Sequence, residues 1–216
     1  NAPGRALVHT SDRAFTTLAG GKYWSLNKYS DMEQIAAKPT TYNGYLFRSK
    51  LEAKWAVFFD RLGKPYEYEP EAFRCNDGSQ YTPDFYLPEL MIRFFGSEKT
   101  GAYLEVKPLG FLSGLPYEQQ PYLRRISSAL PSNKLCLMVG EPYEVLFTPF
   151  NPENIRLCPS SDNFFALSFC DECETLSIVS RHDNHRACPN CECYMEMKTI
   201  KQAAIYARQY RFDYLK

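Results

Sequence analysis

Long apolar runs are missing from this sequence. No stretch approaches the roughly 20 consecutive apolar residues that a membrane-spanning helix needs. The first residues also lack the apolar core of a secretion signal. We therefore expect a soluble, intracellular protein of the cytoplasm with no membrane partner. Because the first residue is Asn1 rather than Met, we also expect a processed or partial chain.

An excess of charge of either sign is missing as well. The 25 Lys and Arg residues balance the 25 Asp and Glu residues, so the formal net charge is zero. The charge of the whole chain therefore gives no signal for binding nucleic acid or a membrane surface. A nucleic-acid role must rest on local groups of residues.

The 216 residues that are present suffice for a substantial buried core. We predict an N-terminal arm or lobe over 1–40, a core domain over 41–160 and a small cysteine-containing unit with a C-terminal helix over 161–216. The core pattern is that of an α/β fold, with helices packed on a sheet. Its predicted elements are a helix over 48–64, strands over 65–73, 81–88 and 101–108, a helix over 117–130 and a strand over 134–140.

The first predicted helix carries both end signals and one carboxylate of interest. Ser49 can cap the N-terminus, Glu52 stands three residues later as in a capping box, and Gly63 supplies a left-handed stop. Glu52 falls at the border of the apolar stripe, so it can face the edge of the core. That stripe consists of Leu51, Trp55, Phe58, Phe59 and Leu62.

Charged residues interrupt two of the predicted strands. Asp84 lies within the aromatic run "YTPDFYLP", and Glu105 and Lys107 lie in "YLEVKP". Because side chains alternate along a strand, Glu105 and Lys107 share a face opposite to Leu104 and Val106. We expect the apolar face to join the core and the other to present a carboxylate beside an ammonium group. Carboxylates can hold a hard divalent cation for phosphodiester hydrolysis, and a nearby lysine can orient the attacking water.

The order of a helix-borne Glu, then P-D, then E-x-K resembles the PD-(D/E)XK nuclease superfamily, over roughly residues 42–140. The resemblance implies a restriction-endonuclease-like core, a mixed sheet flanked by helices. It also implies that Asp84 and Glu105 bind Mg²⁺ or Mn²⁺ and that Lys107 orients the water. Glu52 would be a further ligand, directly or through water.

Each of these residues also has a simpler interpretation. Glu52 could merely complete the capping box, Asp84 after Pro83 could be a turn residue, and Glu105 with Lys107 could form a solvated strand face. Together the simple interpretations require residue type, order and secondary structure to coincide, which favours the metal site.

Four of the eight cysteines form two C-x-x-C pairs, Cys170 with Cys173 and Cys188 with Cys191. Two such turns can surround a tetrahedral Zn²⁺ ion, and the unit resembles a zinc ribbon. Four thiolates leave no open position for substrate, so this zinc would be structural. Alternative ligands to these four cysteines are His182, His185 and Cys193. An iron–sulfur cluster is a less favoured alternative to zinc, because all four cysteines lie in one compact unit.

Polar and basic residues elsewhere are weaker candidates for contact with phosphate. The equally simple interpretation is a set of solvated side chains on helices. These candidates are Gln119, Gln120, Arg124, Arg125, Arg181, Arg186, Lys198 and Lys201.

The function predicted from these features is a Mg²⁺-dependent endonuclease that hydrolyses DNA, in processing of phage or mobile-element DNA or in defence against it. The first alternative is a catalytically idle module that uses the nuclease fold and the zinc ribbon to bind nucleic acid or protein. A ribonuclease ranks lower, since no dedicated reader of single-stranded RNA is recognisable. DNA is the expected partner, together with a second copy of the chain or a partner protein.

Overall fold

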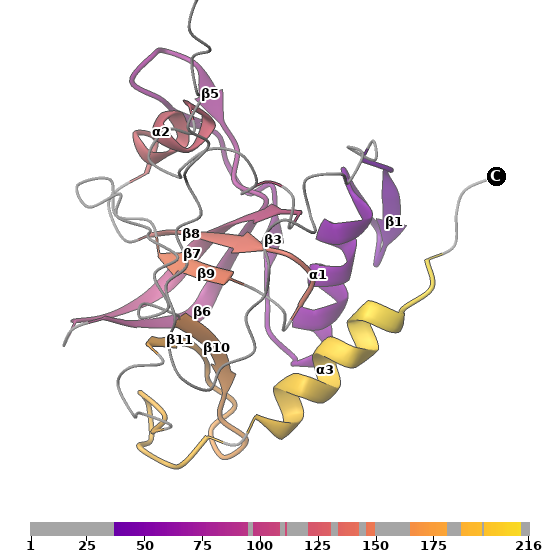
Figure 1. Ribbon diagram of the computed structural model, residues 1–216, viewed down its shortest axis with the longest axis vertical. Helices are drawn as coiled ribbons and strands as arrows, with labels where there is room; N and C mark the ends of the chain where they lie inside the picture. Colours follow the sequence, from indigo (N-terminus) through magenta and orange to yellow (C-terminus); the bar gives the residue numbers. More distant parts are fainter. Residues whose placement is uncertain are drawn as a thin grey trace, which may run out of the picture.

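The computed structural model describes most of the chain from residue 37 onward and forms a mixed α/β structure with helices packed on a mixed sheet (Figure 1). All statements below concern the described residues. Within them, no helix is long and apolar enough to cross a membrane. The described ranges are 37–94, 97–108, 111, 121–130, 134–142, 146–149, 165–180, 187–195 and 197–212.

The central sheet has seven strands in the order β11-β10-β9-β8-β7-β6-β3. Strands β7 and β8 run parallel, whereas β6 pairs with β7 and β3 in antiparallel fashion. Strand β11 additionally pairs in parallel with β6, so the order of pairing closes on itself. The strands are β3 (Glu67–Tyr68), β6 (Phe85–Phe94), β7 (Ser97–Lys107), β8 (Leu135–Val139), β9 (Leu146–Pro149), β10 (Phe165–Phe169) and β11 (Leu176–Ser180).

Two short hairpins stand beside this sheet. The first joins β1 (Thr40–Tyr42) to β2 (Tyr45–Phe47), and the second pairs β4 (Phe73–Arg74) with β5 (Gln80–Tyr81). The first hairpin turns through Asn43 (φ 47°) and Gly44 (φ 81°). Two successive positive φ angles are the mark of a type I′ turn, which matches the twist of a tight hairpin.

Helix α1 (Lys50–Arg61) confirms the predicted caps. The Ser49 hydroxyl accepts a hydrogen bond from the Glu52 backbone N–H at 3.1 Å, and Gly63 has a φ of 65°. The Trp55 indole N–H donates to the Gly140 carbonyl at 3.1 Å, which fixes the helix against the end of β8. The amphipathic pattern therefore positions the first turn of α1, and with it Glu52, at the edge of the sheet.

The main core lies between the sheet and helices α1 and α3 (Lys198–Gln209), which pack against each other (Figure 1). Its members come from both the predicted 41–160 core and the predicted 161–216 unit. From the latter come Leu167, Phe169, Leu176, Ile178, Ile200, Ala203, Ala204, Ala207 and Phe212. Strands β10 and β11 thus extend the same sheet, and the cysteine-containing unit shares its core with the rest of the structure.

A second, smaller core lies on the other face of β7 and β8, under helix α2 (Pro121–Ser127). Pro121 is the first residue of α2, where a missing backbone N–H costs nothing. Strand β8 sends Cys136 and Met138 to the main core and Leu137 and Val139 to the second core. The helix and aromatic rings cover the face of β7 that carries Glu105 and Lys107, so this face presents its carboxylate and ammonium group to a buried environment.

Candidate functional site

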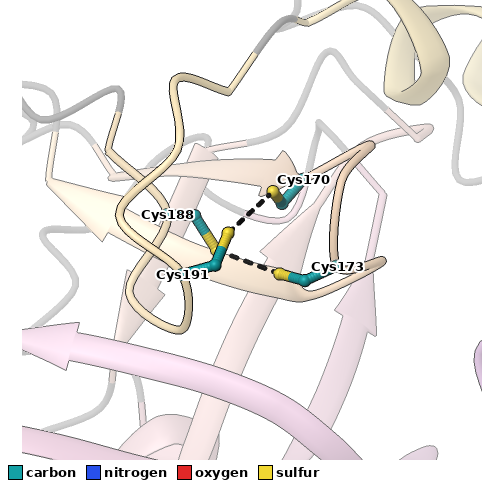
Figure 2. Close-up of side chains that lie close together, drawn as sticks. All are labelled: Cys170, Cys173, Cys188 and Cys191. Carbon is teal, nitrogen blue, oxygen red and sulfur yellow. Dashed lines mark hydrogen bonds between the residues drawn. The ribbon is translucent and has the colours of Figure 1, made fainter.

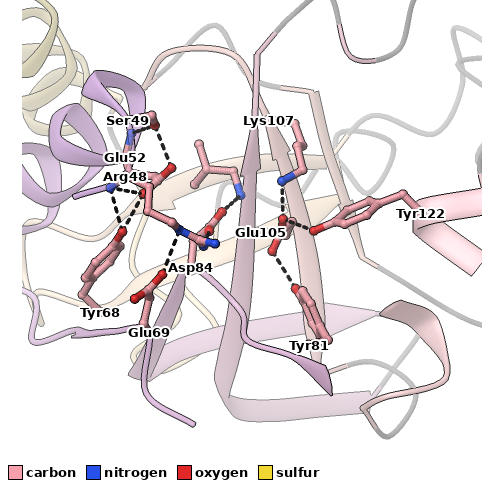
Figure 3. Close-up of polar contacts among 11 residues, drawn as sticks. Arg48, Ser49, Glu52, Tyr68, Glu69, Tyr81, Asp84, Glu105, Lys107 and Tyr122 are labelled. Carbon is pink, nitrogen blue, oxygen red and sulfur yellow. Dashed lines mark hydrogen bonds and ion pairs between the residues drawn. The ribbon is translucent and has the colours of Figure 1, made fainter. Parts of the chain in front are cut away.

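Asp84 lies directly before β6 and is 2% exposed. Its Oδ2 atom accepts a hydrogen bond from the Val106 backbone N–H of β7 at 2.7 Å. Its Oδ1 atom accepts one from Nη2 of Arg48 at 2.6 Å (Figure 3). The aspartate amid aromatic residues is therefore neither a solvated turn residue nor a packing residue, because its carboxylate joins the start of β6 to β7.

Glu105 and Lys107 lie on the same face of β7, as the strand alternation predicts (Figure 3). Glu105 is 2% exposed, and its Oε2 atom accepts a hydrogen bond from the Tyr81 hydroxyl at 2.7 Å. Its Oε1 atom accepts hydrogen bonds from Nζ of Lys107 and from the Tyr122 hydroxyl. Nζ of Lys107 also lies 4.9 Å from the centre of the Tyr122 ring. This buried network contradicts the interpretation as a solvated strand face.

Glu52 contributes to the cap of α1 and also contacts the polar network around Asp84, which we call the acidic group together with Glu105. Its Oε1 atom accepts from the Ser49 hydroxyl at 2.7 Å, a cap contact that differs from a capping box, in which the carboxylate accepts from the backbone N–H of the cap residue. Its Oε2 atom accepts from the Tyr68 hydroxyl at 2.7 Å and from the Arg48 backbone N–H at 3.1 Å. The two interpretations of Glu52 are thus compatible, since one carboxylate oxygen serves the cap and the other faces the site.

Arg48 connects these groups and was missed in the sequence. Its guanidinium group donates to Asp84 and forms an ion pair with Glu69, from Nε to Oε1, at 2.8 Å. Its backbone N–H points toward Glu52 and Tyr68 (Figure 3). The available signal was its position one residue before the helix cap, where a side chain can turn back over the first turn. The side chain of Glu69 is exposed and reaches the site through Arg48, while its backbone N–H donates to the Asp84 carbonyl at 3.0 Å.

The electrostatics of the site follow from burial of several acids together. Burial and the neighbouring Glu105 raise the pKa of Asp84 well above its ordinary value. Burial and Glu105 likewise raise the pKa of Tyr81, so its hydroxyl remains a proton donor. Four carboxylates (Glu52, Glu69, Asp84 and Glu105) meet two cationic side chains, Arg48 and Lys107. With all six ionised, two negative charges remain, which one divalent cation would neutralise.

The donor set fits a hard divalent cation in part. Mg²⁺ is commonly held by one or two carboxylates with water completing the shell, and Asp84 with Glu105 supplies such a pair. Within the part of the chain that the structure describes, Glu52, Asp84 and Glu105 do not form a group of three whose oxygens all lie within 4.8 Å of one another. The three carboxylates therefore do not all converge directly on one ion in this arrangement.

The hydrogen bond from Tyr81 to Glu105 gives a direct test of this network. Tyr81→Phe should lower the free energy of unfolding by about 1.5–3 kcal/mol, because the buried carboxylate loses a charged hydrogen bond. Tyr103→Phe is the matched control, since its hydroxyl donates to the exposed Glu71 at 2.7 Å. Urea denaturation of both variants measures the difference. Equal losses would show that Glu105 does not depend on Tyr81.

The four predicted cysteines form a second candidate site. Cys170 and Cys173 lie in the turn between β10 and β11, and Cys188 and Cys191 lie in a second turn that faces it (Figure 2). The four sulfur atoms lie within 4.8 Å of one another. Sγ of Cys170 is 3.6 Å from that of Cys191, and Sγ of Cys173 is 3.5 Å from that of Cys188. The structure therefore brings all four sequence-predicted cysteines together.

This cluster fits a tetrahedral metal ion. Zn–S bonds of about 2.3 Å require sulfur–sulfur separations of about 3.8 Å, close to the distances found. The two turns are alike: Cys170 N–H donates to Thr175 O at 3.0 Å, and Cys188 N–H donates to Cys193 O at 2.8 Å. Burial raises the pKa of Cys173, but several hydrogen bonds, led by that with Thr175, together lower it to about 6, whereas the pKa values of the neighbouring Cys188 and Cys191 are raised. Cys193 is exposed and lies outside the cluster, so it is a poor substitute ligand.

The remaining predicted contacts are dispersed. Arg125 lies on α2, where it donates to the Ser79 hydroxyl at 3.2 Å and stacks on Tyr122 at 5.4 Å. Arg124 is exposed on the same helix, and Lys198 and Lys201 are exposed on α3. Four further candidates lie outside the described residues: Gln119, Gln120, Arg181 and Arg186.

Comparisons with known proteins found no match: no protein-family model, curated protein or solved structure matches this chain. The membership of the PD-(D/E)XK superfamily therefore stays a prediction. What the chain does must be inferred from the acidic site and the cysteine cluster themselves.

Proposed function

We propose that this chain is a divalent-cation-dependent endonuclease of the PD-(D/E)XK type that hydrolyses phosphodiester bonds in DNA. The observation that carries the proposal is the hydrogen bond from the Val106 N–H to Asp84. It ties the P-D element to the E-x-K strand, so that Asp84, Glu105 and Lys107 belong to one buried polar group. Carboxylates buried beside a lysine are costly to a fold, and such groups occur most often at functional sites.

The arrangement of the elements supports the same proposal. Helix α1 precedes the antiparallel pair of β6 and β7, and α2 connects β7 to its parallel neighbour β8. This is the helix, strands, helix, strand order that the resemblance implies. A restriction-endonuclease-like core is accordingly the fold that we propose.

The chemistry assigns a distinct role to each residue. A divalent cation would supply a lowered pKa for the attacking water and a charge that offsets the phosphate. Asp84 and Glu105 would hold that cation through their carboxylate oxygens. Lys107 would orient the water, whose oxygen forms the new bond to phosphorus as the bond to the leaving sugar oxygen breaks. The rings of Tyr122 and Phe111 limit the movement of the ammonium group.

One observation favours the idle binding module as a second candidate. Both oxygens of Asp84 and both oxygens of Glu105 already accept hydrogen bonds from protein groups. A site that is satisfied in this way could persist as a structural network without binding a cation. Cation binding and cleavage therefore distinguish the two candidates.

Nicking of supercoiled plasmid tests the proposal. The full chain with Mg²⁺ or Mn²⁺ should convert supercoiled plasmid to open-circular and linear forms, and EDTA should prevent this. Branched DNA, single-stranded DNA and RNA of equal length should be assayed in parallel to identify the substrate. Failure to cleave any of them, together with retained binding, would favour the idle module, and cleavage of RNA alone would make it a ribonuclease.

For the cysteine cluster we propose a structural Zn²⁺ in a zinc ribbon. Four thiolates complete a tetrahedral shell and leave no position for a substrate. Because β10 and β11 leave this cluster to enter the main sheet, the ion would stabilise the whole core as well as the ribbon.

The raised pKa of Asp84 predicts how cation binding depends on pH. The protonated carboxyl is favoured in the fold, so this group's contribution to stability is present at low pH and declines as pH rises through the raised pKa. A cation needs the ionised form, so its affinity should rise up to about tenfold per pH unit below that pKa. The increase in Tm caused by Mg²⁺ should therefore grow as pH is raised through the pKa of Asp84, and Asp84→Asn should remove this dependence. An increase in Tm that stays constant from acidic to alkaline pH would contradict this assignment.

A further inference from the structure

The guanidinium group of Arg48 occupies a position between two carboxylates of the acidic site. It donates to Oδ1 of Asp84 at 2.6 Å and pairs with Oε1 of Glu69 at 2.8 Å (Figure 3). The other Asp84 oxygen accepts from the Val106 backbone N–H, a strand group that cannot move independently. Oδ1 is therefore the Asp84 oxygen that can exchange its partner, and its present partner is a cation.

The arginine side chain is free to leave without loss of the fold around it. Its side chain is 56% exposed, whereas that of Asp84 is 3% exposed. Its backbone N–H is held separately by the Glu52 carboxylate and the Tyr68 hydroxyl. Arg48 also precedes the Ser49 cap and lies outside α1, so rotation of its side chain disturbs no helical hydrogen bond. The main chain is thus anchored while the charged end faces solvent.

Lys107 provides a contrast that limits the inference to Arg48. Its side chain is 22% exposed, and its ammonium group pairs with Glu105 on the same strand and lies over the rings of Tyr122 and Phe111. That lysine is held on several sides. Of Arg48 and Lys107, only Arg48 combines a contact to Asp84 with an exposed side chain.

We propose that Arg48 is a tethered cation that occupies the place of the divalent cation against Asp84 and is exchanged for it. The proposal rests on the cation site of the proposed function. In the absence of the divalent ion, Arg48 offsets the charge of the buried acid. When the ion binds, Asp84 exchanges the guanidinium group for it, and the arginine turns outward to solvent. Arg48 is then an internal competitor that sets the cation concentration at which the site fills.

The competing interpretation is that Arg48 is a permanent support for Asp84. The two interpretations predict opposite effects of removing the guanidinium group. A competitor weakens cation binding, so its removal strengthens binding. A support orients the ligand, so its removal weakens binding.

Mn²⁺ binding to the full chain, followed by electron paramagnetic resonance, separates the two. Arg48→Met should bind Mn²⁺ roughly tenfold more tightly than the wild type, because a charged hydrogen bond no longer has to be broken. The Mn²⁺ affinity of Arg48→Lys should lie between those of the wild type and Arg48→Met. Lysine keeps the positive charge but lacks the planar guanidinium group that contacts both carboxylates. Arg74→Met is the matched control, as Arg74 is exposed on β4 and should leave binding unchanged. Asp84→Asn, which lacks the proposed carboxylate ligand, measures the Mn²⁺ that binds elsewhere on the chain.

Equal or weaker binding by a folded Arg48→Met variant would overturn the proposal and leave Arg48 as a support. Absence of binding by the wild type and by every variant would overturn the proposed cation site as well, so the two failures are distinguishable. Thermal melting of each variant shows whether it is folded. If Arg48→Met does not fold, the Mn²⁺ affinity of Arg48→Lys and the chemical modification described next distinguish the competitor from the support.

Chemical modification tests the exchange in the unaltered chain. Phenylglyoxal reacts with arginine side chains that are free, and mass spectrometry reports the modified residue. Addition of Mg²⁺ should raise the rate of modification of Arg48 several-fold, while that of Arg74 stays constant. An unchanged or lower rate for Arg48 under conditions in which Mn²⁺ binds would overturn the proposal.

Discussion

Replacing Lys107 with alanine is expected to lower Mg²⁺-dependent plasmid cleavage by about two to four orders of magnitude, the range associated with a positioned proton-handling or charge-stabilising group. The reason is its location. Its ammonium group is bound to Glu105 and lies over Tyr122, so it is fixed beside the proposed cation ligand. Loss of this group would leave the attacking water without orientation, while Asp84 and Glu105 could still hold the cation. Initial rates of plasmid nicking at saturating Mg²⁺ measure the effect.

The control for this variant is another lysine in a salt bridge. The side chain of Lys64 is 11% exposed, and its ammonium group pairs with Glu89 at 3.1 Å. Lys64→Ala should retain cleavage within about threefold, because it removes a comparable ion pair worth roughly 1 kcal/mol or less. Mn²⁺ binding and zinc content of Lys107→Ala should match those of the wild type. Full cleavage by this variant would remove Lys107 from the proposed chemistry, and full cleavage by Asp84→Ala would remove the site altogether.

Local patterns in the sequence predicted the parts of this structure that local physics determines. Ser49, Glu52 and Gly63 specify the ends of α1 through hydrogen bonds and backbone angles within a few residues. The alternation along β7 separates Leu104 from Glu105 in the same way, and each C-x-x-C turn is a local structure. In these cases the residues that determine the structure are neighbours in the chain.

The missing parts depend on contacts between distant segments. The sequence gives no pattern that pairs β11 with β6, and the aromatic residues over Glu105 come from β5 and α2. Arg48 and Asp84 lie 36 residues apart, so no spacing rule connects them. The burial of Glu105 could not be predicted for the same reason: periodicity tells which side chains share a face, whereas tertiary packing decides whether that face meets water.

The second large effect is expected at the cysteine cluster. Cys173→Ser should release about one Zn²⁺ per chain and lower the free energy of unfolding by several kcal/mol, a large part of the roughly 5–15 kcal/mol typical of a domain. The sulfur of Cys173 lies 3.5 Å from that of Cys188 and 3.2 Å from the Thr175 hydroxyl, so its loss removes one corner of the cluster. Zinc content by atomic absorption and thermal melting measure the two effects.

Cys193→Ser is the matched control, because Cys193 is exposed and is not one of the four clustered cysteines, and a serine hydroxyl can keep its side-chain hydrogen bond to Cys191. This variant should keep its zinc and its Tm. The position of β11 between β10 and β6 predicts a further consequence for Cys173→Ser. Because β11 begins directly after Thr175, loss of the ion should loosen the pairing of β11 with Met91 and Ile92 of β6, and amide hydrogen exchange should rise there. Zinc loss with unchanged exchange in β6 would show that the ribbon is energetically separate from the core, and unchanged zinc content would contradict the metal site itself.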